Sequence, residues 1–172
     1  EQIVSSHLQV SGAGELSFAT QFGAAIATGF FEANEAALLD FHHKYLTKLK
    51  SFSNGNLFVT DKMPQNFLYI GLLAAVFPEA KIVHVQRNPT AVCWGNYKKY
   101  FTSKSIGYCY GLDDVVTYYS LYQNLLELWK TKLPNRIYNL DYERLTTNQG
   151  DETKKLIQHL GLDWDENCLS PQ

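Results

Sequence analysis

The chain has 172 residues, a formal net charge of −2, and a composition that is 45% hydrophobic and 14% aromatic. By general scaling, a chain of this length buries about 70% of its unfolded surface, so we interpret it as a soluble, folded single domain over residues 1–172. The small net charge excludes a global attraction to nucleic acid or to anionic membranes. Any bound anion must therefore be held by a local cluster of positive groups.

The first half of the chain contains two predicted helices and one predicted strand. Residues 32–50 place apolar side chains near helical spacing and end before a Ser-Asn-Gly-Asn turn, so we predict a helix there. Residues 57–60 (LFVT) form a short β-rich run and predict a strand. The polar residues 61–64 then open an apolar helix over 65–77, with Pro64 in its first turn.

In the second half, a predicted strand followed by a predicted helix occurs twice more. Residues 81–86 (KIVHVQ) predict a strand, and a helix follows from about Thr90 to Tyr100. Residues 113–129 predict a long helix. A third strand is predicted at 136–140 (RIYNL), and the segment "DETKKLIQHLGL" predicts a closing helix.

Strand, polar residues and helix thus occur in that order three times, which predicts an α/β fold in which a parallel sheet is flanked by helices. Ligands of such sheets bind beyond the carboxyl ends of the strands. Here those ends carry Lys62, Arg87 and Tyr142, which we expect at one edge of the sheet. Two of these three side chains are cations, so an anionic ligand is implied.

Arg87 is the strongest single candidate in this pattern. It follows a predicted strand directly and precedes a predicted helix, whose first amides carry partial positive charge. A guanidinium fork beside a helix N-terminus suits phosphate or sulfate. The alternative is that Arg87 pairs with an acidic neighbour and that Asn88-Pro89 only starts the helix.

Cysteine usage and hydropathy bear on the compartment. Cys93, Cys109 and Cys168 are odd in number and widely spaced, and no C-x-x-C pair occurs, which predicts buried thiols in a reducing compartment. No stretch approaches the roughly 18 apolar residues of a membrane span, and no leader is apparent, so we expect a cytoplasmic protein. His84, inside a predicted strand, is expected in the core.

Four segments resemble a known family: "VTDKMPQNFLYIGLLAAVFPEAKIVHVQRNP", "AVCWGNYKKYF", "DDVVTYYSLY" and "YNLDYERL". They are similar to sulfotransferases that use 3′-phosphoadenosine 5′-phosphosulfate (PAPS), in the bacterial branch often fused to tetratricopeptide repeats and related to tyrosylprotein sulfotransferases. The resemblance implies a P-loop-NTPase-like fold. It also implies transfer of a sulfuryl group from PAPS, the co-substrate, to a hydroxyl or amine acceptor without a metal.

The resemblance also assigns nucleotide-binding residues. Arg87 matches the arginine of the 3′-phosphate motif. That motif usually has a serine eight positions later, where this chain has Gly95, so only a backbone amide or Asn96 can replace the hydroxyl. Tyr142 in "LDYERL" matches a residue near the adenine or phosphate, although a core tyrosine is an equal alternative.

Two residues receive catalytic roles from the same resemblance. Glu15 in "GAGEL" is similar to the general base of the relatives, and a partly buried carboxylate with a raised pKa would suit that role. Its alternative is a helix-start residue after a Gly-rich turn, and His7 competes for the role of base. Lys62 matches the lysine that stabilises charge on the oxygen between phosphate and sulfate, and its alternative is a solvated surface lysine.

The family's 5′-phosphosulfate loop would precede Glu1, and its C-terminal portion would follow Cys168. We therefore expect an incomplete sulfotransferase fold, inactive as this fragment, with an exposed sheet edge available to pair with another copy in a homo-oligomer. Two alternatives stay open at this point. One is a non-catalytic nucleotide-binding or assembly module, and the other is a P-loop kinase relative, which requires a G-x-x-x-x-G-K-[ST] loop. The acceptor cannot be named from the sequence.

Overall fold

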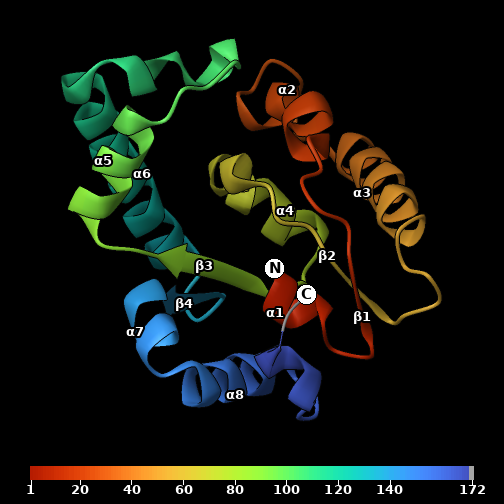
Figure 1. Cartoon of the computed structure of the whole chain (residues 1–172). Coiled ribbons are helices and arrows are strands. Elements are labelled where there is room, and N and C mark those ends of the chain that lie inside the picture. The colour runs from red at the N-terminus through yellow and green to blue at the C-terminus, as the bar shows by residue number, and fades with distance from the viewer. Residues whose placement is uncertain (171–172) are drawn as a thin grey trace. The chain divides into compact units, whose positions relative to one another are not determined.

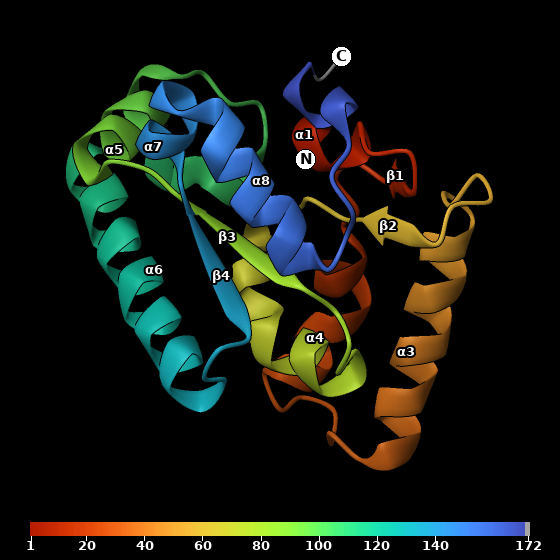
Figure 2. The ribbon, with the colours of Figure 1, turned by 90° about the horizontal axis from the view of Figure 1, so that it is seen from below.

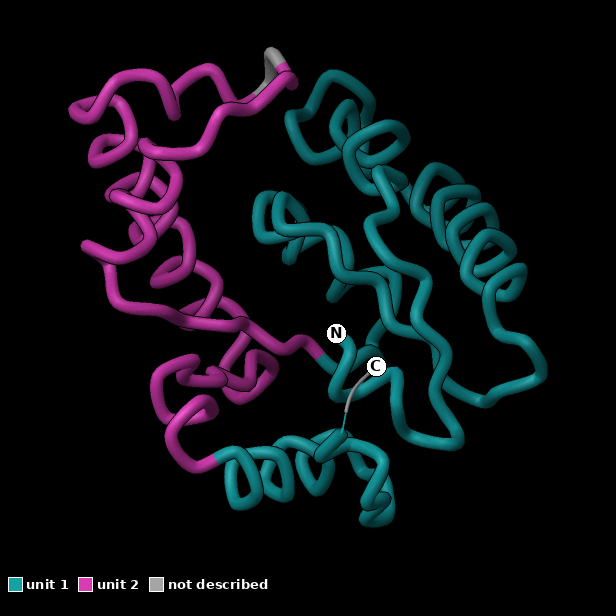
Figure 3. The backbone as a smooth tube through the Cα atoms, in the orientation of Figure 1, with its two compact units in different colours: residues 1–81, 149–172 teal, residues 82–148 magenta. Residues whose placement is uncertain are grey.

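The structure is a computed structural model that describes residues 1–170, without the side chains of residues 104 and 105. The chain divides into two compact units (Figure 3). Unit 1 comprises Glu1–Lys81 and Gln149–Gln172, and unit 2 comprises Ile82–Asn148. We describe each unit by itself, and the single-domain interpretation stays a prediction.

Unit 1 contains most of the elements, and Figure 1 labels its α-helices and β-strands. Its helices and strands are α1 (Gln2–Ser5), β1 (Val10–Gly12), η1 (Ala19–Gly23), α2 (Ala24–Ala27), α3 (Glu35–Lys50), β2 (Phe58–Thr60), η2 (Pro64–Tyr69), α4 (Ile70–Val76), α8 (Gln149–Leu160) and η4 (Glu166–Leu169). Of these, η1 is a π-helical turn, whereas η2 and η4 are 3₁₀ helices.

The main core of unit 1 is aromatic. Phe41 and Tyr45 of α3 are almost completely buried and pack edge-on, with ring centroids 5.7 Å apart. Phe18 stacks on Tyr45 at 4.6 Å. The buried Leu16 and Val76 complete the centre of this cluster, so α3 is held against the segment after β1 and against the end of α4.

Unit 2 contains β3 (Ile82–Gln86), α5 (Pro89–Lys98), η3 (Lys104–Tyr110), α6 (Leu112–Lys132), β4 (Ile137–Asp141) and α7 (Tyr142–Thr147). Figure 2 shows the long helix α6 alongside β3 and β4. Val115 and Leu126 of α6 and Leu140 of β4 are at most 4% exposed, so both elements contribute buried side chains to the interior of unit 2.

The strands form two short parallel sheets. In unit 1, β1 pairs with β2, and Gly12 lies opposite Thr60. In unit 2, β3 pairs with β4, and Gln86 lies opposite Asp141. The fold is therefore the expected mixed α/β fold with parallel sheets flanked by helices, but the three predicted strands do not share one sheet.

This correction has a local reason. The strand β1 was not predicted, because only Val10 among its three residues is a typical strand former and the segment is too short to show alternation. Its backbone nevertheless provides the ladder partner of β2. The three predicted strands themselves are confirmed at β2, β3 and β4.

Most predicted helices are confirmed, with two differences. The segment after Pro64 begins as a 3₁₀ helix and becomes α-helical only at Ile70, because the backbone at Tyr69 (φ −114°, ψ 11°) departs from α geometry. A short helix, α7, lies between β4 and α8 where none was predicted, and the Asp141 side chain caps it by accepting from the Arg144 amide. None of the described helices combines the length and apolarity that a bilayer crossing requires.

Candidate functional site

Unit 1 brings Glu15 and Lys62 together just beyond the carboxyl ends of β1 and β2. The ladder continues past the strands, since the Ala13 amide donates to Thr60 O (2.8 Å) and the Lys62 amide donates to Gly14 O (2.9 Å). Gly14 has φ +71°, a left-handed conformation that favours glycine and turns the chain. The Lys62 ammonium then forms an ion pair with Glu15 Oε1.

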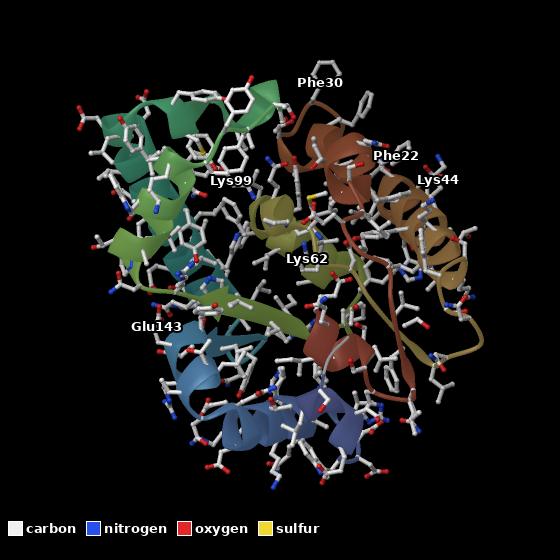
Figure 4. All side chains as sticks on the ribbon, viewed as in Figure 1. Phe22, Phe30, Lys44, Lys62, Lys99 and Glu143 are labelled. Carbon is white, nitrogen blue, oxygen red and sulfur yellow. The ribbon has the colours of Figure 1, made fainter. Side chains whose placement is uncertain are left out.

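This pair is accessible to solvent. The Glu15 side chain is 55% exposed and that of Lys62 is 47% exposed. The partly buried Glu15 carboxylate expected from the sequence is therefore not observed. An exposed ion pair adds little stability, but it can meet a ligand from solution. Figure 4 labels Lys62 among the side chains of unit 1.

Asp61 fixes the segment that carries this pair. Its Oδ1 accepts from the Leu16 amide (3.2 Å), immediately after Glu15. Its Oδ2 accepts from the Tyr45 hydroxyl and from Asn66 Nδ2 (3.1 Å). Burial, and then the hydrogen bond and charge of Asp61, raise the pKa of Tyr45, so its hydroxyl remains a donor. One carboxylate thus joins the chain after β1, helix α3 and helix η2.

His7, the alternative base, is used structurally. It is 5% exposed, and its Nε2 lies 2.9 Å from Asp163 O. Its Nδ1 accepts from the Gln9 amide at 3.1 Å, which leaves Nε2 as the protonated nitrogen that donates to the carbonyl. Both ring nitrogens of His7 are therefore occupied within unit 1.

Unit 2 brings Arg87 and Tyr142 together. They follow the last pair of the β3–β4 ladder, Gln86 opposite Asp141, so the register places them side by side. The Arg87 guanidinium lies over the Tyr142 ring, with its carbon 5.0 Å from the centroid. Tyr142 is 39% exposed, which excludes the alternative of a core tyrosine. A stacked guanidinium keeps its planar donors oriented.

A carboxylate also reaches this position. Glu143 Oε1 accepts from the Asn88 amide at 3.1 Å and lies 4.0 Å from Arg87 Nε. The Arg87 and Glu143 side chains are each 50% exposed. The acidic neighbour considered as an alternative for Arg87 is thus present, at the outer limit of an ion pair and beside a guanidinium that remains half exposed.

The start of α5 offers fewer free amides than expected. Pro89 has no N–H, and the Ala91 amide donates to the Asn88 side chain at 3.1 Å. Asn88 therefore does start the helix, as its alternative role required. An anion at this end of α5 depends on Arg87 more than on the helix amides.

Gly95 and Asn96 lie in the second half of α5. A Cβ atom built on Gly95 meets no atom within 4 Å, so the space beside its backbone is open. A ligand group can approach the main chain there, and a serine hydroxyl would also fit. Asn96 is partly exposed.

His84 lies in a polar network on β3 and is half-buried, not fully in the core. Its Nδ1 lies 2.9 Å from Asn139 Oδ1, and its Nε2 is hydrogen-bonded to the Tyr122 hydroxyl. Burial lowers the pKa of His84, the Asn139 bond opposes this, and the Lys130 charge lowers it further. Burial, with a smaller effect of Tyr119, raises the pKa of Tyr122 to about 12. The imidazole is therefore favoured in its neutral form.

Cys93, Cys109 and Cys168 are free thiols, and the last two are buried as predicted. Burial raises the pKa of Cys109 and of Cys168. Among the described residues, no group of three or more His, Cys, Asp or Glu side chains is arranged to hold a metal ion.

Taken within each unit, the site residues form two sets. Glu15 and Lys62 are in contact in unit 1, and Arg87 and Tyr142 are in contact in unit 2. The roles predicted for them, and for Gly95 and Asn96, stay predictions. The juxtaposition of Lys62 with the Arg87 set also stays a prediction.

The fold and these groups define an α/β protein whose parallel strands deliver charged side chains at their carboxyl ends. The model of a family described as "Sulfotransferase family" matches residues 1–166. The chain belongs to the sulfotransferase family, as its motifs suggested.

The chain is similar to three curated proteins, two of which are named sulfotransferases. A protein of Aquifex aeolicus (strain VF5), described as uncharacterized, is 29% identical over 185 residues, covering 98% of this chain and 24% of that protein. The omega-hydroxy-beta-dihydromenaquinone-9 sulfotransferase Stf3 of Mycobacterium bovis and of Mycobacterium tuberculosis is 35% identical over 118 residues, covering 64% of this chain and 30% of that protein. The chain thus spans less than a third of the length of these relatives.

Three residues of the two sites were missed in the sequence analysis. Asp61 stood directly after a predicted strand, which was a signal for a polar residue near the site. Glu143 stands in the motif "LDYERL", which assigns it no role. Tyr45 lies in the segment 32–50, whose spacing predicts a helix, and no sequence pattern indicates that its hydroxyl reaches Asp61.

Proposed function

We propose that this chain forms part of a sulfotransferase that moves a sulfuryl group from PAPS to a hydroxyl or amine acceptor. The observation that carries the proposal is the accessible Glu15–Lys62 ion pair beyond the carboxyl ends of β1 and β2. A carboxylate can take the proton of the acceptor, and an ammonium can stabilise charge on the leaving oxygen. The family of the chain supports this choice of reaction.

In the proposed mechanism, the Glu15 carboxylate removes the proton of the acceptor hydroxyl as the acceptor oxygen attacks sulfur. The bond between sulfur and the oxygen that bridges to phosphate breaks, and its electron pair stays on that oxygen. The Lys62 ammonium stabilises the negative charge that develops there. When bound, PAPS supplies the activated sulfuryl group. The ion pair of the free protein opens to admit both reactants.

The nucleotide would be held by the second set of residues. The Arg87 guanidinium, stacked on Tyr142 and half exposed, would donate to the 3′-phosphate. The open space beside Gly95 fits a phosphate that approaches the backbone, with Asn96 as a further donor. These residues therefore suit the nucleotide.

The mycobacterial relatives favour a hydroxyl acceptor over an amine, since their name specifies an omega-hydroxy compound. The three free thiols support a reducing compartment, and we propose the cytoplasm.

Calorimetric titration with 3′,5′-adenosine bisphosphate tests the nucleotide half of the proposal. Arg87→Ala should weaken this ligand on the order of tenfold or more, because a charge-assisted contact is lost. Arg87→Lys should recover only part of the affinity, because an ammonium has no bidentate fork. The affinity for 5′-AMP, which lacks the 3′-phosphate, should change little in either variant. Equal weakening of both nucleotides would count against the assigned role.

A non-catalytic nucleotide-binding module is the second candidate. It is favoured by the exposure of Glu15, since a general base commonly lies in a more buried setting. Glu15→Gln separates the two. We propose that the chain is inactive by itself, so the comparison is made in a version completed with the 5′-phosphosulfate loop of the family. There an enzyme should lose transfer while it keeps its affinity for 3′,5′-adenosine bisphosphate, whereas a module has no transfer to lose.

A further inference from the structure

Glu143 occupies an unusual position in unit 2. It belongs to the first turn of α7, yet its carboxylate bonds to the Asn88 amide, which is 55 residues away in sequence. The same oxygen lies 4.0 Å from Arg87 Nε. This carboxylate therefore lies at the two groups that are best placed to receive a ligand anion beyond β3.

Helix capping does not account for this contact. The N-cap of α7 is Asp141, whose side chain accepts from the Arg144 amide at 2.8 Å. The N-cap of α5 is Asn88, whose side chain accepts from the Ala91 amide at 3.1 Å. An acidic residue in the first turn of α7 suits the helix dipole, but that effect does not require a bond across to Asn88.

We propose that Glu143 is an internal anion that holds the Arg87 site in the free protein and that a phosphate must displace. This inference rests on the proposed function, in which Arg87 binds the 3′-phosphate. A phosphate and the Glu143 carboxylate at the same donors are like charges close together, and their repulsion lowers the affinity for phosphate. The Glu143 side chain is half exposed, so it has access to water once it is displaced.

Displacement would act on two groups at once. The Asn88 amide becomes available to a phosphate oxygen, and the carboxylate charge that lies 4.0 Å from Arg87 Nε moves away. The Tyr142 ring keeps the guanidinium in place throughout, because its contact with Arg87 does not involve Glu143. Glu143 thus makes the site selective for ligands that are anionic enough to replace a carboxylate. Neutral or weakly charged groups would leave Glu143 bonded to the Asn88 amide.

The direct test is Glu143→Gln in the full chain, titrated with 3′,5′-adenosine bisphosphate. Glutamine retains an oxygen that can accept from the Asn88 amide, but it carries no charge. The affinity should rise on the order of fivefold, and the affinity for 5′-AMP should stay unchanged. Unchanged or weaker binding of the bisphosphate would overturn the inference.

Glu127→Gln is the matched control. Glu127 also lies in unit 2, its side chain is 70% exposed, and it pairs with Lys130 at 2.7 Å. The variant makes the same change in net charge at a residue outside the proposed site. If it raises the affinity as much as Glu143→Gln does, the effect comes from net charge and the inference is wrong.

A measurement on the unmodified chain guards against misfolding of the variants. The ¹³C resonance of the Glu143 carboxylate and the amide resonance of Asn88 should both move as 3′,5′-adenosine bisphosphate is added, and neither should move with 5′-AMP. If both resonances stay fixed while the nucleotide binds, Glu143 is not displaced.

The outcomes separate this inference from the proposed function. Binding that is sensitive to Arg87→Ala but not strengthened by Glu143→Gln leaves the proposed function standing and overturns only the role of Glu143. If the wild-type chain, Arg87→Ala and Glu143→Gln all fail to bind the bisphosphate, the proposed function fails and this inference fails with it.

Discussion

The two charged sites are built alike at the level of the backbone and differently at the level of the side chains. In each unit a pair of parallel strands ends and a cation meets a carboxylate. In unit 1 the contact is direct, between Lys62 and Glu15. In unit 2 the cation is stacked on a ring, and the carboxylate bonds mainly to a backbone amide.

The difference indicates different tasks. A flexible ammonium paired directly with a carboxylate suits proton removal and charge stabilisation, in which both groups must be free to meet reactants. A guanidinium fixed over an aromatic ring suits recognition of a fixed anion. We therefore expect variants in unit 1 to separate chemistry from stability, and variants in unit 2 to act on ligand affinity.

The largest effect on stability is expected at Asp61, which supports the pair in unit 1. Asp61→Ala removes the acceptor of three donors: the Leu16 backbone amide, the Tyr45 hydroxyl and the Asn66 side-chain amide. We expect a loss of about 3 kcal/mol or more in the free energy of unfolding, because donors that were paired in the interior lose their partner. Urea unfolding monitored by circular dichroism measures this.

Tyr45→Phe is the milder companion to this variant. It keeps the ring that stacks on Phe18 and removes a single hydrogen bond, so the expected loss is about 1–2 kcal/mol. If the two variants lower the free energy of unfolding equally, the bonds of Asp61 to Leu16 and Asn66 add nothing to stability.

The next effect concerns Lys62 and is kinetic. In a version completed with the 5′-phosphosulfate loop of the family, Lys62→Met should lower the rate of sulfuryl transfer to a phenol acceptor on the order of a hundredfold, because a cation at the leaving oxygen is lost. The free energy of unfolding should change by less than about 1 kcal/mol, since the ion pair is exposed. Steady-state rates and urea unfolding of the same preparation provide both values.

Lys44→Met is the control for Lys62. Lys44 is also a lysine of unit 1 in an exposed ion pair, with Asp40 at 2.6 Å, and Figure 4 labels both lysines. It is not placed in the site. A similar fall in rate for Lys62→Met and Lys44→Met would show that the loss comes from the change in net charge and not from the position of Lys62.

A smaller effect is expected from pH, and it separates the units. Burial lowers the folded-state pKa of His84 in unit 2 and of His159 in unit 1 below the ordinary value of 6.5. The unfolded chain therefore binds protons first as the pH falls. The stability due to the neutral imidazoles is present above about pH 6.5 and is lost as the pH falls through the folded-state values.

We therefore expect the free energy of unfolding to fall as the pH drops below about 6.5, and His84→Gln to flatten this slope. His159→Gln should remove a separate part of this pH dependence. Proton NMR titration of the two imidazoles measures the pKa values directly. A His84 midpoint at or above 6.5 would contradict the role assigned to its burial.

The smallest effect is expected at Gly95. Gly95→Ser should raise the free energy of unfolding by about 0.5 kcal/mol, because serine is the better helix former. The open space there accommodates the hydroxyl, so the affinity for 3′,5′-adenosine bisphosphate should also rise, on the order of threefold. Gly107→Ser, outside α5 and also with open space, should leave the affinity unchanged. If Gly95→Ser weakens binding, the nucleotide does not approach α5 at this position.

Local patterns determined the strands β2, β3 and β4, the long helices α3 and α6, and the positions of Lys62, Arg87 and Tyr142 after strands. These features depend on residues that are close in sequence, where periodicity and β propensity are informative. The contact between Arg87 and Tyr142 also follows once β3 and β4 are paired in parallel, since register then places them side by side.

Tertiary structure alone decided which strands pair and which polar groups meet. The partner of β2 is a three-residue strand with little β propensity, and it is chosen by backbone hydrogen bonds that leave no pattern in the sequence. Asp61 meets Leu16 and Tyr45, and Glu143 meets Asn88, across 16 to 55 residues. Such contacts depend on how distant segments are brought together in space, whereas periodicity reports only which face of its own element a residue occupies.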